Sequence, residues 1–442
     1  MKACARRLLT FALTLGLLAA PGAARGDEPL RLLSDPISYT DVVDAAEAGD
    51  RFDLHARVAF RRTRLTGRIQ RETGDPLGVR FETVGRYLHL RNELELGLDV
   101  GLFRDTAFYA RLPLVLRDDR RLDARGAGAS RLDAPGTAGR EPLFELPFIS
   151  PTRSGIDELR LGVAFSPLNQ ARRPESPTWT FRTGLDLGVG RPLRPCAANQ
   201  EGCSPGVSPA THAFTAETRL SRRYRSAEVY TGLGMALAWT GRAEGRYAPA
   251  GALPGHRRRR PPTEGFWTVG TAFLPWENRE AQQRLSLDVR GHLHFFSPGR
   301  DYSPLFDALG ASDHPALTTP ACEGAPAPGQ GCEDAGLALV PFTGLTDVQQ
   351  RLRLGTTLGV ELRVARYVAF RFASTLAYQT PYLLTFTRAC NSGTTRPASD
   401  PRSCAGGIRD PHHRPVIDLP GQRFRMDGAT ILAFRLEARA MF

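Results

Sequence analysis

Apolar and polar residues alternate along most of the chain with a period of two. From Leu432 to Phe442 every second residue is apolar, and Arg435, Glu437 and Arg439 lie between the apolar positions. Successive side chains of a β-strand point to opposite faces. This stretch therefore predicts a strand with one apolar face and one charged face.

Eleven further segments show the same alternation. They cover or centre on residues 52–60, 88–102, 107–117, 157–166, 178–190, 211–221, 228–239, 266–274, 284–296, 350–363 and 367–378. The apolar positions run for about nine to eleven residues in each segment, which is the length that a tilted strand needs to cross a membrane. Together with the last strand, the pattern predicts twelve strands.

Short and long connections alternate between these strands. The long connections cover residues 62–86, 118–155, 190–211, 240–264, 297–348 and 379–422. Strict alternation places all of them at one end of the strands, whereas a soluble β-sandwich, the alternative fold, has no reason for this asymmetry. We expect an all-β fold, an antiparallel transmembrane β-barrel of about twelve strands with short periplasmic turns and long outer loops.

The amino-terminal residues have the features of an export signal. Lys2, Arg6 and Arg7 precede an apolar run at 8–20, and small residues follow up to Gly26. This pattern is typical of a secretory signal peptide. We therefore expect a cleaved signal peptide at 1–26, a periplasmic segment at 27–50, a barrel at 51–442, and localisation in the cell outer membrane of a Gram-negative envelope.

The segment before the first strand has its own pattern. Ser38 and Asp41 resemble a helix capping box, and Gly49 can end a short helix. Residues 37–49 could plug the barrel mouth or contact a periplasmic partner. The alternative is a packed leader that covers the first strand.

The six cysteines after the signal peptide form three close pairs, each within a long connection. The pairs are Cys196 with Cys203, Cys322 with Cys332, and Cys390 with Cys404. An oxidising compartment predicts three local disulfides. A zinc site is disfavoured because no pair has the Cys-x-x-Cys spacing, so we expect no metal and no cofactor.

Arginine supplies nearly all of the positive charge, since Lys2 is the only lysine in a chain with a net charge of +12. A GC-rich genome explains this bias, and selection for bidentate contacts to phosphate or carboxylate is the alternative. Nucleic acid is not an expected partner of an exported chain whose basic residues alternate with acids. In the stretch "GHRRRRPP" we expect contact with lipopolysaccharide phosphates, the alternative being a mobile charged loop; its basic residues are Arg257, Arg258, Arg259 and Arg260.

The terminal strand resembles the recognition strand of bacterial outer-membrane β-barrels. The resemblance implies that the barrel-assembly machinery reads Phe434, Leu436 and Phe442 as an assembly signal. The stretches "LRNELELGLDVGLFRDTAFYARLPLVL", "RSGIDELRLGVAF" and "GLDLGVGRPLRP" resemble transporter-like outer-membrane barrels found with aromatic-compound degradation genes. Ser154, Gly155 and Asp157 match the element that opens a strand in that family, whose second glycine is absent here.

The charged face of each strand must point into the lumen if the apolar face meets lipid. The expected lining consists of Arg57, Arg91, Glu93, Glu95, Asp99, Arg111, Arg160, Arg182, Asp186, Arg219, Asp288, Arg290, His292, Arg353, Arg371, Arg435 and Glu437. These residues could form a salt-bridge network around a narrow passage, or line a weakly anion-preferring pore.

The expected function is passive or facilitated passage of small polar or amphipathic solutes through this narrow, charge-lined lumen. The alternative is a structural or interaction barrel whose disulfide-braced outer loops bind a surface polymer or an envelope, adhesion or motility machine. We expect no enzyme activity, because no serine with a supported geometry accompanies His212 at the rim.

Deletion of Phe442 should impair insertion, because the assembly signal would lose its terminal aromatic ring. The folded fraction recovered from outer membranes measures the effect, and Phe442→Tyr, which keeps an aromatic ring, is the matched control. Normal assembly of the deletion variant would contradict this account.

Overall fold

The computed structural model describes residues 37–45, 53–75, 78–125, 132, 141–249, 256–278, 280–322, 330, 332–389 and 410–442. All of them belong to one compact unit, residues 34–442. The expected signal peptide at 1–26 and the pair Cys390 and Cys404 lie outside the described residues.

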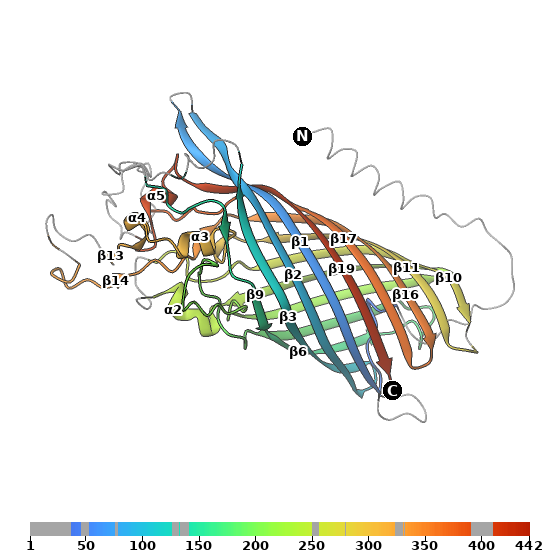
Figure 1. Ribbon diagram of the computed structural model, residues 1–442. Coiled ribbons are helices and arrows are strands. Elements are labelled where there is room, and N and C mark those ends of the chain that lie inside the picture. Colours follow the sequence, from blue (N-terminus) through green and yellow to red (C-terminus); the bar gives the residue numbers. More distant parts are fainter. Residues whose placement is uncertain are drawn as a thin grey trace. The chain divides into compact units, whose positions relative to one another are not determined.

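Twelve long strands form a closed antiparallel barrel, as the sequence predicts (Figure 1). Each long strand pairs with the next along the chain, and the last pairs with the first. The strands are β1 (Leu54–Asp75), β2 (Gly78–Phe103), β3 (Thr106–Ala124), β6 (Leu159–Leu168), β7 (Thr178–Leu187), β8 (His212–Tyr224), β9 (Ala227–Trp239), β10 (Glu264–Asn278), β11 (Gln283–Phe296), β16 (Arg351–Ala365), β17 (Val368–Gln379) and β19 (Phe424–Met441).

The pairing of β1 with β19 closes the sheet. It runs from His55 opposite Met441 to Arg71 opposite Phe424. Beyond the pair of His55 and Met441, Leu54 N–H donates to the Phe442 carbonyl at 3.1 Å and Phe442 N–H donates to the Leu54 carbonyl at 2.9 Å. The terminal phenylalanine is therefore part of the closing hydrogen-bond ladder.

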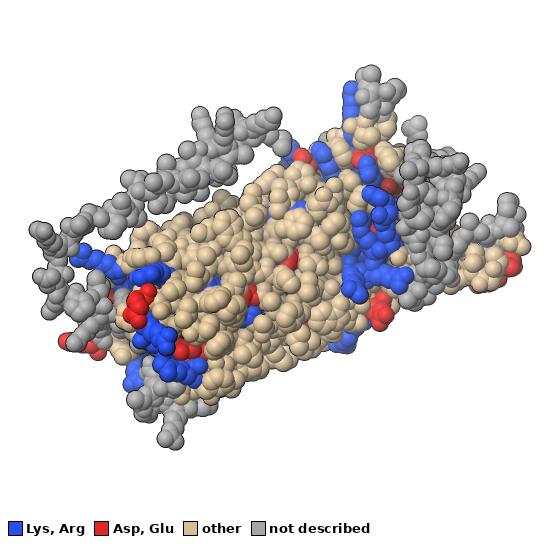
Figure 2. Space-filling view, turned by 180° about the vertical axis from the view of Figure 1, so that it is seen from behind, with Lys and Arg blue, Asp and Glu red and all other residues tan. Residues whose placement is uncertain are grey.

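On the side of the barrel seen in Figure 2, the surface carries little charge between two charged ends. Large apolar side chains are exposed on the outward face of every long strand, among them Phe60, Phe181, Leu233, Leu358 and Leu436. The four tryptophans Trp179, Trp239, Trp267 and Trp276 are exposed near strand ends. A barrel with this surface can be immersed in hydrocarbon, where no backbone group is left unpaired at an edge.

No helix in the described part of the chain is long and apolar enough to cross a membrane.

The ends of the barrel differ as expected. Turns such as those between Phe103 and Thr106 and between Tyr224 and Ala227 mark one end, here called the short-turn end. The long connections all lie at the other, the loop end. The first connection is shorter than predicted, because β1 and β2 remain paired through Asp75 opposite Gly78. Residues 62–86 are thus mostly strand, and β3 likewise continues to Ala124 instead of ending near 117.

The other long connections fold into a structure over the loop end, here called the cap. Its elements are β4 (Phe148–Ile149), β5 (Arg153–Ile156), η2 (Gly241–Ala243), α2 (Glu244–Tyr247), β12 (Gly299–Asp301), α3 (Phe306–Gly310), α4 (Pro315–Thr318), β13 (Ala321–Cys322), β14 (Leu339–Val340), β15 (Thr346–Val348), β18 (Tyr382–Leu383) and α5 (Pro415–Asp418). Leu305, Leu309 and Ile417 of the cap pack with Ile69 and Val84 from the extended hairpin. The extra strand length therefore supplies one wall of the cap core.

Two of the three expected disulfides are confirmed, and both lie in cap connections. They join Cys196 to Cys203 and Cys322 to Cys332. Each closes a short loop, so that the pairing is local, as the cysteine spacing predicts.

The cap should be more stable in mild acid than at alkaline pH. Both carboxylate oxygens of Asp418 accept backbone N–H groups, from Thr387 at 2.9 Å and from Arg414 at 2.8 Å. Burial raises the pKa of the Asp418 carboxyl to about 7 with help from the nearby carboxylate of Asp347, although the two backbone N–H groups and Arg300 oppose the rise. Burial likewise raises the pKa of the Asp410 carboxyl to about 6.

A carboxyl with a raised pKa in the folded state stabilises the fold below its unfolded pKa of about 4, and this contribution is lost as pH rises through the folded value. Hydrogen exchange at 410–418, corrected for intrinsic rates, should therefore show greater protection at pH 5 than at pH 8. Asp418→Asn should flatten this dependence. Equal protection at both pH values in the unmodified protein would contradict the prediction.

Candidate functional site

Residues 37–45, here called the lumen segment, lie inside the barrel near the short-turn end. Ile37, Tyr39, Thr40 and Val43 are buried. The segment turns at 38–40, where Thr40 N–H and Asp41 N–H both donate to the Ile37 carbonyl at 3.0 and 3.1 Å. The described residues of the expected helix at 37–49 thus form a turn, and residues 46–52 lie outside the described chain.

Polar contacts with strands and turns on several sides of the barrel hold the lumen segment. Arg371 of β17 donates to the Ser38 hydroxyl at 2.8 Å, and Asp41 pairs with Arg439 of β19 at 3.5 Å. Asp44 pairs with Arg172 in the β6–β7 turn and accepts the backbone N–H of Asp105 in the β2–β3 turn at 3.2 Å. The segment is therefore bound to widely separated parts of the barrel wall.

Tyr39 is the central anchor of the segment. Its ring lies 4.5 Å from the ring of Tyr230, and the guanidinium groups of Arg219 and Arg290 lie over it at 4.5 and 5.0 Å. Arg219 also donates to the Tyr39 carbonyl at 2.5 Å. A side chain at Gly232 would collide with the Tyr39 hydroxyl, so the glycine on β9 leaves room for this ring.

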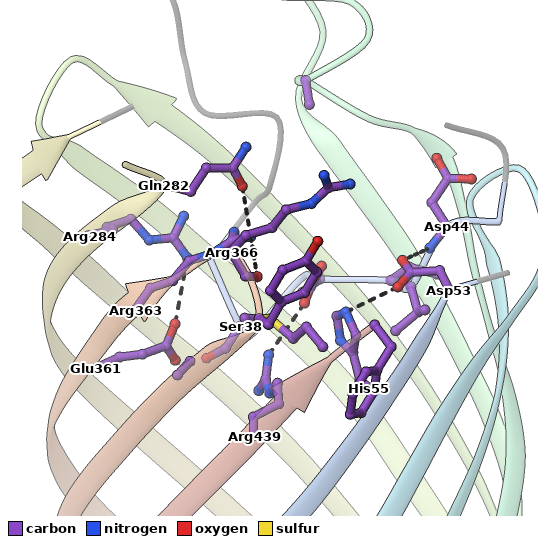
Figure 3. Close-up of a pocket in the computed structure, with 18 of the residues that line it drawn as sticks. Ser38, Asp44, Asp53, His55, Gln282, Arg284, Glu361, Arg363, Arg366 and Arg439 are labelled. Atoms are coloured by element: carbon purple, nitrogen blue, oxygen red, sulfur yellow. Dashed lines mark hydrogen bonds and ion pairs between the residues drawn. The ribbon is translucent and has the colours of Figure 1, made fainter. Parts of the chain in front are cut away.

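A cavity of about 380 Å³ opens beside the lumen segment at the short-turn end. Figure 3 shows its charged rim, where Arg284 pairs with Glu361 at 3.5 Å and His55 lies 3.5 Å from Asp53. Asp53 in turn accepts the backbone N–H of Asp44 at 3.2 Å. The mouth is thus lined by alternating charges that extend onto the segment itself.

A second cavity, of about 530 Å³, lies within the lumen on the inner side of the segment. Ten arginines and six carboxylates are among the residues that line it. Twelve of them were predicted from the sequence, namely Arg57, Glu95, Asp99, Arg111, Arg160, Arg182, Asp186, Arg219, Arg290, Arg371, Arg435 and Glu437. The excess of arginine gives this cavity a positive charge.

Shared carboxylates join most of these arginines into a salt-bridge network. Asp99 accepts from Arg57 and from Arg111, each at 2.5 Å. Glu437 lies between Arg435 at 2.8 Å and Arg439 at 3.3 Å. Multiple charged hydrogen bonds offset the cost of removing each carboxylate from bulk water, and they hold the arginines at set positions.

Two arginines of the cavity have no carboxylate partner in the described part of the chain. Arg61 and Arg182 line the cavity and make no ion pair there, although the Arg182 guanidinium lies 4.7 Å from the ring centroid of Tyr109. Asp186 lines the same cavity and also has no ion-pair partner among those residues. Arg61 and Arg182 are therefore positioned to meet an anion in the lumen.

The other predicted lining residues lie outside this cavity. Arg91 pairs with Glu93 at 3.2 Å and with Asp157 and Asp118 towards the cap. Asp288 binds Arg290 and Arg371 at 2.6 and 3.2 Å. The two remaining residues are near the loop end, where His292 lies edge-on to His294 and Arg353 donates to Gln379 at 3.1 Å.

The basic stretch from Arg257 to Arg260 is attached to the cap. Arg258 lies 3.6 Å from Asp347 and over the ring of Phe386 at 4.7 Å. The backbone of the stretch is held too, since Arg257 N–H donates to Asp410 at 3.1 Å and the Arg260 carbonyl accepts from Arg300 at 3.0 Å. Contact of these arginines with lipopolysaccharide stays a prediction.

No protein-family model matches the chain, and no curated protein matches it. Similar solved structures include an outer membrane channel from Pseudomonas putida F1, with a TM-score of 0.41 and 8% identity over 92% of this chain and 99% of that one. A Pseudomonas aeruginosa FadL homologue has a TM-score of 0.32 and 9% identity over 88% and 90%. The outer membrane protease OmpT from Escherichia coli has a TM-score of 0.29 and 6% identity over 88% and 97%. These similarities assign no family, solute or activity to the chain.

Tyr39→Ala should release the lumen segment. Truncation of a buried aromatic side chain costs roughly 3 kcal/mol, which corresponds to about a hundredfold shift of a local opening equilibrium. In a Ser38→Cys background, thiol labelling from the short-turn side should become faster by that order. Arg104→Ala, an exposed change at the same end, is the control, and an unchanged labelling rate in the Tyr39 variant would refute the anchoring role.

Proposed function

We propose that the protein is an outer-membrane channel that passes small polar or amphipathic solutes and prefers anions. The observation that carries the proposal is the cavity of about 530 Å³ in the lumen, lined by ten arginines and six carboxylates. A pore lined by an excess of fixed positive charge attracts anions and repels cations. The volume suits a small solute.

The topology supports a periplasmic position for the short turns. Outer-membrane barrels have short periplasmic turns and long outer loops. The lumen segment and Phe442 both lie at the short-turn end, so both would face the periplasm after export. In this orientation Phe434, Leu436 and Phe442 form the assembly signal of the last strand, and a periplasmic partner would approach residues 37–49 from the short-turn end.

The anion preference would come chiefly from Arg61 and Arg182. A guanidinium binds a carboxylate or phosphate through two parallel hydrogen bonds. Most other arginines of the cavity already share a carboxylate, as Arg57 and Arg111 share Asp99. The ion-paired arginines therefore maintain the shape of the cavity. Arg61 and Arg182, which have no carboxylate partner in the described part of the chain, would donate hydrogen bonds to a passing solute.

The lumen segment would act as the gate of the channel. It occupies the lumen between the two cavities, and its contacts are a few hydrogen bonds and ion pairs around one aromatic anchor. Such a segment can detach without disturbing the backbone ladder of the barrel. Passage of solute would follow detachment of the segment or its displacement towards the periplasm.

The cap favours a second function, in which the barrel serves as a support for a binding surface. Its core is buried, with Leu305, Leu309 and Phe424 nearly inaccessible to solvent, and one of its loops is closed by Cys322–Cys332. A surface polymer or another envelope component could bind to such an ordered structure. A barrel with this function needs no conducting lumen.

Conductance measurements in planar bilayers distinguish the two functions. The purified protein should conduct, and deletion of residues 37–45 should raise the conductance several-fold because the gate is removed. Arg61→Glu with Arg182→Glu should abolish the preference for anions, measured as the reversal potential in a salt gradient. Arg104→Glu with Arg173→Glu, which places the same charge change outside the lumen, is the control.

Absence of conductance both with and without residues 37–45 would overturn the channel proposal and favour the binding barrel. Unchanged ion selectivity in the double variant would remove Arg61 and Arg182 from the proposed pathway.

A further inference from the structure

A groove of about 400 Å³ lies on the outer wall of the barrel towards the loop end. It is formed by β1, β2 and β19, with Tyr378 of β17 at one side. Its polar lining includes Thr66, Arg68, Thr83, Arg86, Arg125, Asp427 and Thr430. This groove is separate from the lumen and plays no part in the proposed passage of solutes.

Two arginines of the groove face each other across neighbouring strands. Arg68 on β1 is directly opposite Arg86 on β2, and both side chains are exposed on the outward face. Like charges at directly opposite positions destabilise a sheet. An anion bound between them would convert this repulsion into attraction.

The carboxylates near the groove neutralise only part of its charge. Asp427 pairs with Arg68 at 2.7 Å, and Asp123, which is opposite Arg86 on β3, pairs instead with Arg121 at 3.0 Å. Arg86 and Arg125 make no ion pair in the described part of the chain. Three arginines and one aspartate therefore line the groove, with threonine hydroxyls between them.

The groove described above is here called the upper groove. A second groove of about 430 Å³, the lower groove, lies nearer the short-turn end on the same side of the barrel and is mainly apolar. It is lined by Val58, Phe60, Leu94, Phe370, Phe372 and Leu436, with Ala438 at its lower edge. Ala438 lies eight positions along β19 from Thr430. At about 3.3 Å per residue and a tilt of about 40°, this is roughly 20 Å along the barrel axis, comparable with one hydrocarbon leaflet of about 15 Å.

Further arginines are exposed on the outward face of β1 and β3 near the upper groove. Arg62 on β1 and Arg117 on β3 are exposed on either side of Asn92 in the β1–β2–β3 register. In the same part of the barrel towards the loop end, β16 exposes Leu352 and Leu354. Towards the loop end, β16 therefore exposes leucine where β1 and β3 expose arginine. This difference indicates that lipid headgroups, rather than acyl chains, contact this part of β1–β3.

We propose that the upper groove binds the phosphorylated headgroup of a glycolipid of the lipopolysaccharide type, with an acyl chain along the lower groove. Arg68, Arg86 and Arg125 would hold the phosphate, and the hydroxyls of Thr66, Thr83 and Thr430 would contact the sugar. The site rests on the outer-membrane placement of the barrel and on none of its transport properties. It assigns lipid recognition to the strand wall, whereas Arg258 of the basic loop already contacts Asp347 in the cap.

The test uses the full-length protein in detergent micelles and purified lipopolysaccharide with a minimal sugar core. Native mass spectrometry should show binding that falls at least about tenfold when the lipid is enzymatically dephosphorylated. The triple variant R68Q/R86Q/R125Q should lose affinity by a similar factor. R104Q/R173Q, which removes exposed arginines at the short-turn end, should bind as the unmodified protein does.

Equal binding of phosphorylated and dephosphorylated lipid, or undiminished binding by the triple variant, would overturn the proposal. Complete competition by millimolar inorganic phosphate would do the same, since it would identify a free-anion site. Conductance of the triple variant is measured in parallel. Loss of lipid binding by the triple variant with normal conductance supports the lipid site. Absence of conductance in the unmodified protein together with normal lipid binding refutes only the transport proposal.

Discussion

The fold depends on one constraint, which is that hydrocarbon offers no hydrogen-bond partner to the backbone. The sheet must close, and the pairing of β1 with β19 closes it up to the bonds between Leu54 and Phe442. Closure divides every strand into an outer face and an inner face. Apolar side chains of the outer face can then meet lipid, and the charged side chains of the inner face line the lumen.

Confinement of so many charges explains the salt-bridge network. Each lumen carboxylate that contacts two arginines, such as Asp99 or Glu437, satisfies several donors at once. The lumen segment joins this network through Asp41, which pairs with Arg439, whereas Asp44 pairs separately with Arg172. Two more guanidinium groups lie over the Tyr39 ring. The interior is therefore a polar core shared by the strands and the segment, with residual space in two cavities.

The presence of each strand, and the face to which each of its side chains points, could be predicted because the period of two is a local property of the sequence. All twelve strands are present, and most predicted lining residues face the main cavity. Residues 62–86 were expected as a loop, yet β1 and β2 continue as a paired hairpin whose Ile69 and Val84 pack in the cap. That extension has no clear alternation, since its stability comes from a partner strand and from distant loops. Short helices such as α3 leave no periodic signal either.

The sequence by itself determined the number of strands, the face of each side chain, the end at which the long connections lie, and the local pairing of Cys196 with Cys203. Only the tertiary structure decided that residues 37–45 enter the lumen, that Arg61 and Arg182 make no ion pair in the described chain, and that Arg68 faces Arg86. The first group depends on neighbours a few residues apart. The second depends on the register between strands and on contacts such as Asp41 with Arg439, which join opposite ends of the chain and exist only after the barrel has closed.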